Sequence, residues 1–529
     1  MGDLLIFILP LAGILPIIRI KYTMKKQAFV VTLLISMSLV ACQKNTGIEL
    51  VDKESLLRTN NYTYVDYADY NAYDVDSCPS IGEPKLLIVP IWFTNSDRYI
   101  KGQGKQNVRE DIEKAYIGTP EETGWHSVSS FYKEESKGKC DLKATVTDWY
   151  EIDQKTSYYY RSTGRVMRLV SDAVGWYFGN HPEDSRSNYD TDHDGYLDGV
   201  MLIYGCPDYT ELNIGTVDTS NLWAYCYWLQ NPELKDPANP GPNSFFWASY
   251  DFMYDTDKAM ERAGTSYGGG DNRFCDVDAH TYIHEMGHVF GLDDYYDYSS
   301  NFDPAGSFSM QDYNVGGHDP YSVMALGWAN PIVPTKSCQI EFDSFQETHD
   351  VVLLSANYGE SPFDEYLLLE LYTPTGLNEF DSKNRYKQAY PLGPSTCGIR
   401  LWHVDARLLL HKDSGDYAIT NKAINDDGCV EHAFSNTYGS DGHGSPLGPN
   451  YLNYKLLQLI RNNPLETYKS KTMLGYEDLF YVGDTFSISQ FQKQFIKEND
   501  LNAENHFTWS FTVDSVFDGT AKITFTKEK

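Results

Sequence analysis

Strand and helix patterns alternate in the first half of the chain, and this alternation most restricts the folds it can adopt. Residues 85–93 (KLLIVPIWF) and 200–204 (VMLIY) are continuous apolar runs of the length expected for buried strands. Between them, apolar residues recur on one face of 165–178, as in an amphipathic helix. Weaker patterns predict helices over 106–116, 123–132 and 274–290, and a strand over 142–150. We therefore expect an α+β domain over residues 81–332.

Beyond Trp328 the pattern changes to short strands separated by turn residues. The expected strands are 340–342, 351–355, 365–372, 398–404, 507–512 and 521–526. A series of this kind is typical of an all-β sandwich. Two prolines fall between Asn330 and Lys336, so we place a boundary there and assign residues 333–529 to a β-rich, sandwich-like C-terminal domain.

The charge of the chain excludes one broad class of function. Its 529 residues include 43 Lys and Arg against 74 Asp and Glu, which gives a formal net charge of −31. Phosphate binding requires patches of Lys and Arg, so we expect no nucleic-acid partner. The 41% of apolar residues and 22% of charged residues are ordinary for a globular protein. We expect a monomer.

The N-terminal residues resemble an export signal. An apolar stretch over 28–41 follows Met24-Lys25-Lys26 and ends in Leu39-Val40-Ala41-Cys42. This ending resembles the bacterial lipobox, in which the cysteine is lipidated and becomes the mature N-terminus. We therefore predict an extracytoplasmic lipoprotein of the cell envelope, or a secreted protein, that touches the membrane only through a lipid on Cys42.

Two further predictions concern this part of the chain. Residues 1–42 form the export segment, of which 1–23 read as upstream sequence before the true start, because the signal is complete from Met24 onward. Neither this stretch nor the signal reaches the roughly 20 apolar residues that span a bilayer. Residues 43–80 are rich in Asn, Tyr and Asp and are predicted to be a tether or a short pro-segment.

The cysteine count agrees with export. The chain has nine cysteines, and removing a lipidated Cys42 leaves an even number. They are scattered without CxxC spacing, so they do not form a structural zinc framework. Disulfides in an oxidising compartment and buried free thiols are both compatible with these positions.

The most specific motif is HEMGHVFGLDD, which begins at His284 on the last predicted helix of the α+β domain. On a helix, His284 and His288 are one turn apart, so both imidazoles can bind one Zn²⁺. Glu285 lies beside them and can accept a proton from the attacking water. Gly291 permits the left-handed conformation that ends a helix, and the turn can bring Asp294 back as a third ligand. Three protein ligands with one open position are typical of a catalytic zinc site.

Two alternatives to these ligands remain open. Asp293 is one residue away from Asp294 and rivals it as the third ligand. His280 lies one helical turn before His284, on the same face, and rivals the two histidines.

Downstream, residues 306–313 (GSFSMQDY) contain Met310. HExxHxxGxxD followed by a turn with a methionine resembles the metzincin zinc endopeptidases, and within them the immune inhibitor A group of secreted bacterial metalloproteases. The stretches that resemble this group, in the same order, are 125–150, 189–204, 221–225, 312–328 and 397–405. The resemblance covers most of the chain.

The resemblance implies a fold and roles for residues. The fold is a twisted sheet with a backing helix above a cleft, a zinc helix along its floor and the turn with Met310 under the metal. The implied zinc ligands are His284, His288 and Asp294, and the implied general base is Glu285.

The sequence offers several candidates for two further roles, the oxyanion donor and the groups that accept a hydrogen bond from the ligand histidines. Many metzincins place a tyrosine two residues after the methionine as an oxyanion donor, whereas here that position is Asp312 and Tyr313 follows it. We take Tyr313 as the candidate donor, with His318 and Tyr321 as alternatives. Zinc-bound histidines usually donate their other ring N–H to an acceptor. Candidate acceptors are Asp297, Asp312 and backbone carbonyls.

A second metal site is predicted at DTDHDGYLD, which begins at Asp190 and matches DxDxDGxxD. Alternate carboxylates can converge on one hard cation, and Gly195 permits the sharp turn between them. The expected Ca²⁺ ligands are Asp190, Asp192, Asp194, the carbonyl of Tyr196, and Asp198. Met201 stands where an EF-hand has its bidentate glutamate, so a further ligand could come from elsewhere. The alternative is a solvated, metal-free acidic turn.

Together these features predict a secreted, lipid-anchored zinc endopeptidase acting on proteins or peptides, with water activated by zinc and Glu285 as general base. The alternative is a surface adhesion or glycan-binding protein that keeps a metzincin-like fold as a scaffold. The intact Glu285 favours the enzyme, because a scaffold has no need of it. His403 and Asp405 are expected to be structural residues of a strand.

Overall fold

The computed structural model describes residues 48–60, 78–101, 104–207, 222, 224–254, 277–299, 302–385, 390–411, 417–421, 429–439, 444–503 and 506–528. The predicted export segment 1–42, with its lipidation site Cys42, lies outside these residues. Residues 49–529 form one compact unit of mixed α+β structure. Within the described part of the chain, no helix has both the length and the apolar character needed to cross a bilayer.

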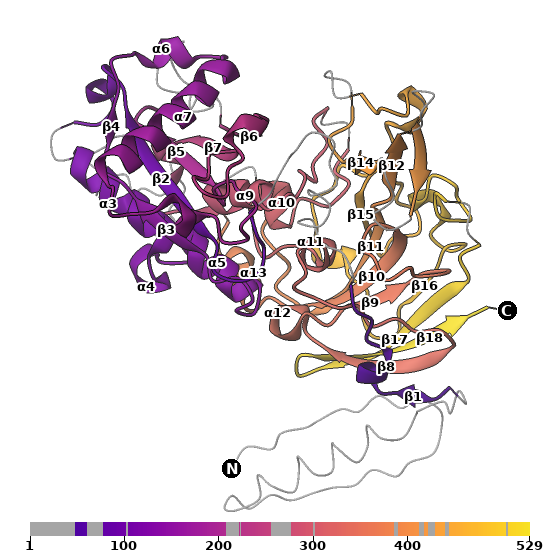
Figure 1. Ribbon diagram of the computed structural model, residues 1–529. Helices are drawn as coiled ribbons and strands as arrows, with labels where there is room; N and C mark the ends of the chain where they lie inside the picture. The colour runs from indigo at the N-terminus through magenta and orange to yellow at the C-terminus, as the bar shows by residue number, and fades with distance from the viewer. Residues whose placement is uncertain are drawn as a thin grey trace, which may run out of the picture. The chain divides into compact units, whose positions relative to one another are not determined.

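A six-stranded sheet forms the framework of the first half (Figure 1). Its strand order is β3-β2-β5-β7-β6, and β4 also pairs with β2. The strands are β2 (Lys85–Trp92), β3 (Lys143–Val146), β4 (Tyr150–Glu151), β5 (Val200–Tyr204), β6 (Tyr225–Trp228) and β7 (Ser244–Ser249). All pair in parallel except β6, which is antiparallel to β7 at the edge. The central strands are buried on both faces, which explains their continuous apolar sequences.

Helices cover the two faces of this sheet. Alternate residues of β2 and β5, such as Leu87 and Leu202, pack with the apolar face of α7 (Thr163–Asn180). The residues between them, such as Ile88 and Ile203, pack with α3 (Gly104–Ile117), α5 (Val128–Glu135) and α9 (His280–Val289). The predicted helix 274–290 corresponds to α9.

The remaining helices are short. They are α4 (Pro120–Thr123), α6 (Thr156–Tyr159), α10 (Met310–Tyr313), α11 (Pro320–Ala325), α12 (Phe345–Thr348) and α13 (Leu377–Lys383), with 3-10 turns η1 (Lys53–Leu56), η2 (Ser96–Arg98), η3 (Arg186–Tyr189), η4 (Pro232–Leu234), η5 (Tyr250–Tyr254), η6 (Pro449–Tyr451), η7 (Tyr476–Asp478) and η8 (Gln492–Gln494). The single helix predicted over 123–132 is wrong. Gly124, at φ 84°, ends α4, and the hydroxyl of Ser127 accepts from the N–H of Ser130 to begin α5.

The second half is built from three further sheets. Their strand orders are β1-β8-β18-β17-β16, β15-β11-β10-β9 and β13-β12-β14. The strands are β1 (Leu50–Val51), β8 (Cys338–Asp343), β9 (Val352–Leu354), β10 (Glu365–Tyr372), β11 (Gly398–Asp405), β12 (Leu408–His411), β13 (Tyr417–Thr420), β14 (Cys429–His432), β15 (Leu457–Ile460), β16 (Thr485–Ser487), β17 (Trp509–Phe517) and β18 (Thr520–Lys527). All six strands predicted beyond Trp328 are present. The first two sheets share one apolar core.

The two predicted domains also share a core. The largest apolar cluster contains residues before the predicted boundary, such as Ile283, and residues after it, such as Phe345 and Trp402. At the end of the predicted tether, Cys78 packs in this cluster and its N–H donates to the carbonyl of Val289. Residues 49–60 of the predicted tether belong instead to the C-terminal sheet. There β1 pairs in parallel with β8, and Lys53 Nζ lies 2.8 Å from Asp343 Oδ2. Residues 49–60 are therefore an integral edge of that sheet.

Six cysteines have described side chains, and all six are free thiols: Cys78, Cys140, Cys206, Cys226, Cys338 and Cys397. Four of them are fully buried, and burial raises the pKa of Cys140 to about 12. The four buried thiols therefore behave as small apolar core residues.

Candidate metal centre

The end of α9 turns the chain back toward the two histidines. Gly291 adopts φ 101°, as the sequence predicts, and the N–H of Leu292 donates to the carbonyl of Gly287 at 3.0 Å. Gly287 is also required inside the helix, because a Cβ there would lie 2.1 Å from Oε1 of Gln311. This turn returns Asp294 to the face of α9 that carries His284.

The three predicted ligands converge on one point. Nε2 of His284 lies 3.1 Å from Oδ1 of Asp294, Nε2 of His288 lies 3.2 Å from the same oxygen, and the two nitrogens are 3.2 Å apart. Bonds of about 2.0–2.1 Å to a tetrahedral Zn²⁺ place neighbouring ligand atoms about 3.3 Å apart. The spacing and the chemistry of this donor set therefore fit zinc.

Backbone carbonyls orient both imidazoles. Nδ1 of His284 donates to the carbonyl of Met310 at 2.8 Å, and Nδ1 of His288 donates to the carbonyl of Leu292 at 2.7 Å. Because a carbonyl can only accept, each ring carries a proton on Nδ1, which leaves Nε2 as the nitrogen that a metal at the converging point would bind in place of a proton. Of the predicted acceptors the carbonyls are correct.

The two carboxylates named as acceptors have other contacts. Asp297 accepts from the N–H and hydroxyl of Ser299, and Asp312 accepts from the N–H of Ser307 at 2.7 Å. The prediction that they orient the ligand histidines is therefore wrong.

Charge favours a cation at this point. Burial disfavours the charged form of Asp294, but His288 and His284 outweigh it and hold the pKa of this carboxyl far below its usual value. Burial also opposes the charge on His288, yet Asp294 raises its pKa to about 10. Burial raises the pKa of Glu285, against the opposing effect of the two imidazoles. A raised carboxyl pKa suits a general base that must later release its proton.

The rival ligands point elsewhere. Nδ1 of His280 lies 2.8 Å from Oδ1 of Asp278, and its Nε2 lies 3.2 Å from Oδ2 of Asp381. Asp293 is partly exposed, and its Oδ2 lies 3.4 Å from Nδ1 of His432. Neither His280 nor Asp293 belongs to the converging group.

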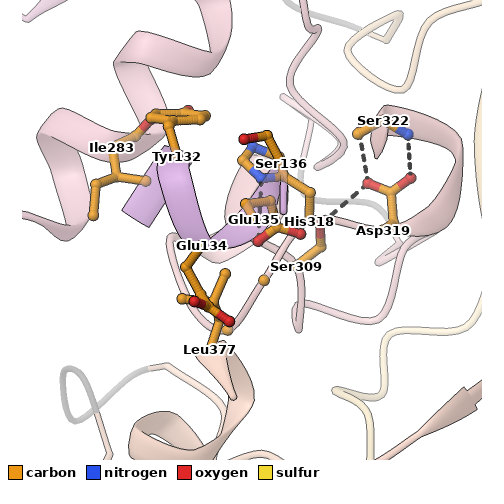
Figure 2. A network of polar contacts seen from close by, with 12 residues as sticks. Tyr132, Glu134, Glu135, Ser136, Ile283, Ser309, His318, Asp319, Ser322 and Leu377 are labelled. Atoms are coloured by element: carbon orange, nitrogen blue, oxygen red, sulfur yellow. Dashed lines mark hydrogen bonds and ion pairs between the residues drawn. The ribbon is translucent and has the colours of Figure 1, made fainter. Parts of the chain in front are cut away.

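A buried polar network supports the turn with Met310 (Figure 2). The hydroxyl of Ser309 donates to Oδ2 of Asp319 at 3.2 Å, and Ser322 donates to the same carboxylate through its N–H at 3.0 Å and its hydroxyl at 2.8 Å. Because Ser309 precedes Met310, these bonds help to fix the carbonyl that orients His284.

The alternative oxyanion donors are buried in other contacts. Nδ1 of His318 lies 3.9 Å from Oε2 of Glu135 on α5, as Figure 2 shows. The hydroxyl of Tyr321 lies 3.0 Å from Nε2 of His432. Both side chains are fully buried in these contacts.

Tyrosines line the other side of the centre, and sequence reasoning missed two of them. The hydroxyl of Tyr298 donates to Oδ2 of Asp294 at 2.6 Å, and the ring of Tyr296 lies 5.4 Å from that of Tyr298. The predicted donor Tyr313 continues this row, with its ring 6.1 Å from Tyr296 and 5.4 Å from Tyr390. The signal in the sequence was the tyrosine-rich segment directly after the third ligand.

The acidic loop brings three of its carboxylates together. Ligand oxygens of Asp190, Asp192 and Asp194 all lie within 4.8 Å of one another. Gly195 has φ 95°, as predicted for the sharp turn. A cavity of about 10 Å³, the volume of a single small ion or water, is lined by Asp192, Asp194 and Asp198.

Asp198 differs from the prediction, whereas the carbonyl of Tyr196 stays a predicted ligand. Asp198 lies outside the group of three carboxylates, and its oxygens accept from the N–H of Thr191 at 2.9 Å and of Lys85 at 2.7 Å. It therefore ties the loop to the start of β2. Tyr196 contributes an N–H that donates to Asp194 at 2.7 Å.

A scan against protein-family models finds no match to this chain, and a search of curated proteins finds no similar sequence.

Proposed function

We propose that the protein is a zinc-dependent endopeptidase of the metzincin type, similar to the immune inhibitor A group. The observation that carries this proposal is the equal spacing of 3.1–3.2 Å between ligand atoms of His284, His288 and Asp294, with Glu285 next to them on the same helix. A structural zinc site closes with four protein ligands, whereas three leave a position for chemistry. Two imidazoles and one carboxylate hold either Zn²⁺ or non-haem Fe(II); the glutamate between the two histidines, which acts as general base in HExxH hydrolases, favours zinc.

The residues of the chain have distinct tasks in this reaction. When bound, zinc supplies Lewis acidity, which polarises a carbonyl and makes water acidic near neutral pH. Glu285 accepts the proton of the attacking water and passes it to the leaving amine. Tyr298 and Tyr296 present phenols to Asp294, and Tyr313 packs against Tyr296; a phenol can stabilise a developing oxyanion. The carbonyls of Met310 and Leu292 keep the imidazoles in place.

The arrangement of elements around the centre supports the metzincin assignment. The mostly parallel sheet has one antiparallel edge strand, β6, and α9 lies on the same face of the sheet as α3 and α5. Met310 is fully buried at the start of α10, and its carbonyl contacts the first ligand. A helix with two ligand histidines beside the sheet and a buried methionine whose carbonyl contacts the first ligand are features that support this assignment.

The test compares Glu285→Gln with the parent protein, both purified with their metal. We expect casein cleavage to fall by about 10²–10⁴-fold, the usual effect of removing a general base. Zinc content should remain that of the parent, because Glu285 is not a ligand. Glu121→Gln, at an exposed position of α4, is the matched control and should cleave casein as the parent does. Equal cleavage by parent and Glu285→Gln would end the proposal.

We also propose that the acidic loop binds Ca²⁺ as a stabilising ion. Burial and the neighbouring Asp190 raise the pKa of Asp192, and burial raises the pKa of Asp198 to about 7. A cation among these carboxylates would relieve both effects.

Export and lipid attachment at Cys42 are proposed from the signal sequence. Cys42→Ala should move the protein from the membrane fraction to the soluble extracytoplasmic fraction. An unchanged distribution after fractionation would contradict lipid attachment at this residue.

A further inference from the structure

The two oxygens of the Asp294 carboxylate have different partners. Oδ1 lies 3.1 Å from Nε2 of His284 and 3.2 Å from Nε2 of His288. Oδ2 accepts a hydrogen bond from the phenol of Tyr298, with 2.6 Å between the oxygens. Hydrogen bonds to an ionised carboxylate are short and strong. This bond therefore selects which oxygen faces the imidazoles.

The turn that carries Tyr298 is itself held firmly. Asp297 accepts from the N–H of Ser299 at 3.0 Å and from its hydroxyl at 2.8 Å, which closes a tight turn around Tyr298. The buried ammonium of Lys455 lies 4.0 Å from Oδ1 of Asp297 and donates to the carbonyl of Asn436 at 2.9 Å. These contacts thus fix the turn that carries the phenol of Tyr298.

Tyr295, the residue directly after Asp294, is held in place as well. The N–H of Tyr295 donates to the carbonyl of Gln311 at 2.9 Å, and its own carbonyl accepts from the amide of Asn436 at 2.6 Å. Its hydroxyl lies 2.8 Å from Oγ of Ser322. The backbone on the C-terminal side of Asp294 is therefore fixed at both Tyr295 and Asp297. The phenol of Tyr298 cannot move along with a rotating Asp294 carboxylate, so rotation would break the hydrogen bond.

We propose that Tyr298 is a positioning residue of the metal centre, which holds Asp294 so that this carboxylate offers one oxygen only. The inference rests on the proposed zinc site and adds a residue to it. A carboxylate without such a donor can rotate and offer both oxygens, as it does toward Ca²⁺. A second carboxylate oxygen would occupy the position that hydrolytic zinc sites keep open. Tyr298 would thereby leave that position free for substrate and water when an ion is bound.

The test is Tyr298→Phe, which removes one oxygen and keeps the ring. Tyr298 is 36% exposed, so the variant should fold. Outer partners of metal ligands typically contribute 10–100-fold to metal affinity. We expect the zinc Kd, measured by competition with a chromophoric chelator, to weaken by about this factor. The Co²⁺-substituted variant should show a weaker visible absorption, typical of a higher coordination number.

Tyr313→Phe is the matched control, because it removes a phenol from the same row, where its ring packs against Tyr296 and Tyr390. Its zinc Kd and Co²⁺ spectrum should equal those of the parent. The inference is overturned if Tyr298→Phe keeps both parental values, even with a reduced kcat, since the phenol would then act on substrate. A lower melting temperature of the metal-free variant together with an unchanged zinc Kd and Co²⁺ spectrum would show that the bond stabilises the fold alone, and this would also overturn the inference. Failure of the parent itself to bind zinc would instead refute the proposed function.

Discussion

The imidazole of His280 stacks on the indole of Trp125, with ring centroids 3.9 Å apart and an angle of 9° between the planes. Its two nitrogens reach Asp278 and Asp381, and all three side chains are fully buried. Asp381 belongs to α13 and also accepts from the N–H of Gly316 at 2.8 Å. The start of α9, the segment after α10 and the C-terminal half therefore meet at one histidine.

This histidine should make stability fall at alkaline pH. Burial opposes its charge, but Asp278 and Asp381 outweigh burial and raise the pKa of His280 from 6.5 to about 9. Folding raises the pKa, so the folded protein holds this proton more tightly than the unfolded chain. The contribution is complete below about pH 6.5, is lost as the pH rises through about 9, and is on the order of 3 kcal/mol. Denaturant unfolding of parent and His280→Asn between pH 6 and 10 should show this difference.

His506 provides the control, since its side chain is fully exposed. His506→Asn should follow the pH dependence of the parent. A gap between parent and His280→Asn that stays constant from pH 6 to 10 would contradict a charged His280.

Gly287 should be needed for packing and for metal affinity. A Cβ at this position would lie 2.1 Å from Oε1 of Gln311, and Nε2 of Gln311 lies 3.5 Å from Nδ1 of His288. Overpacking of this kind costs about 1–3 kcal/mol. We expect Gly287→Ala to lower both the free energy of unfolding and zinc affinity. Gly287→Ala/Gln311→Ala should recover part of both, whereas equal losses in the single and double variants would exclude this contact as the cause.

Calcium should stabilise the protein through the acidic loop. At a concentration 100-fold above its Kd, a ligand that binds only the folded state adds about 2.7 kcal/mol. Calcium should therefore raise the melting temperature of the parent after EGTA treatment, and Asp192→Asn should reduce this rise. Asp172→Asn, at an exposed position of α7, should respond as the parent does. A melting temperature of the parent that changes with neither EGTA nor calcium would refute a bound ion.

Features set by local geometry could be predicted from the sequence. The spacing of His284 and His288 places them on one helix face, and only a left-handed residue such as Gly291 allows the turn that returns Asp294. Strands could also be predicted, because a continuous apolar run such as β5 has to be buried on both faces of a sheet. These inferences need only the geometry of one helix turn or one strand.

Features set by contacts between distant segments could not be predicted. Tyr298 reaches Asp294 because the intervening backbone is held by Asn436, which lies 141 residues beyond Tyr295. Nothing in the local pattern indicates that partner. Asp198 likewise satisfies the acidic motif, yet its oxygens accept from the backbone of β2, which a motif cannot reveal. The shared core also depends on contacts between distant segments. The change in sequence pattern near residue 332 therefore marks a change in secondary structure and not a boundary between two separate cores.

The buried pair Arg400–Glu370 should link the C-terminal sheet to the metal centre. Nε of Arg400 lies 2.8 Å from Oε1 of Glu370, both side chains are at most 2% exposed, and Nη1 of Arg400 donates to the carbonyl of Phe308 at 3.1 Å. Phe308 lies two residues before Met310. Removing one partner of a buried ion pair leaves an uncompensated charge and costs about 3–5 kcal/mol.

We therefore expect Arg400→Met to lower the free energy of unfolding by about 3–5 kcal/mol in urea denaturation and to weaken zinc binding. Arg400→Met/Glu370→Leu should recover much of the stability, because no charge is then left unpaired. Zinc binding should stay weaker than in the parent, since the bond to the carbonyl of Phe308 is still missing. Arg168→Met, at an exposed position of α7, should match the parent. Zinc affinity that returned fully with stability in the double variant would show that the ion pair supports the fold without reaching the metal centre.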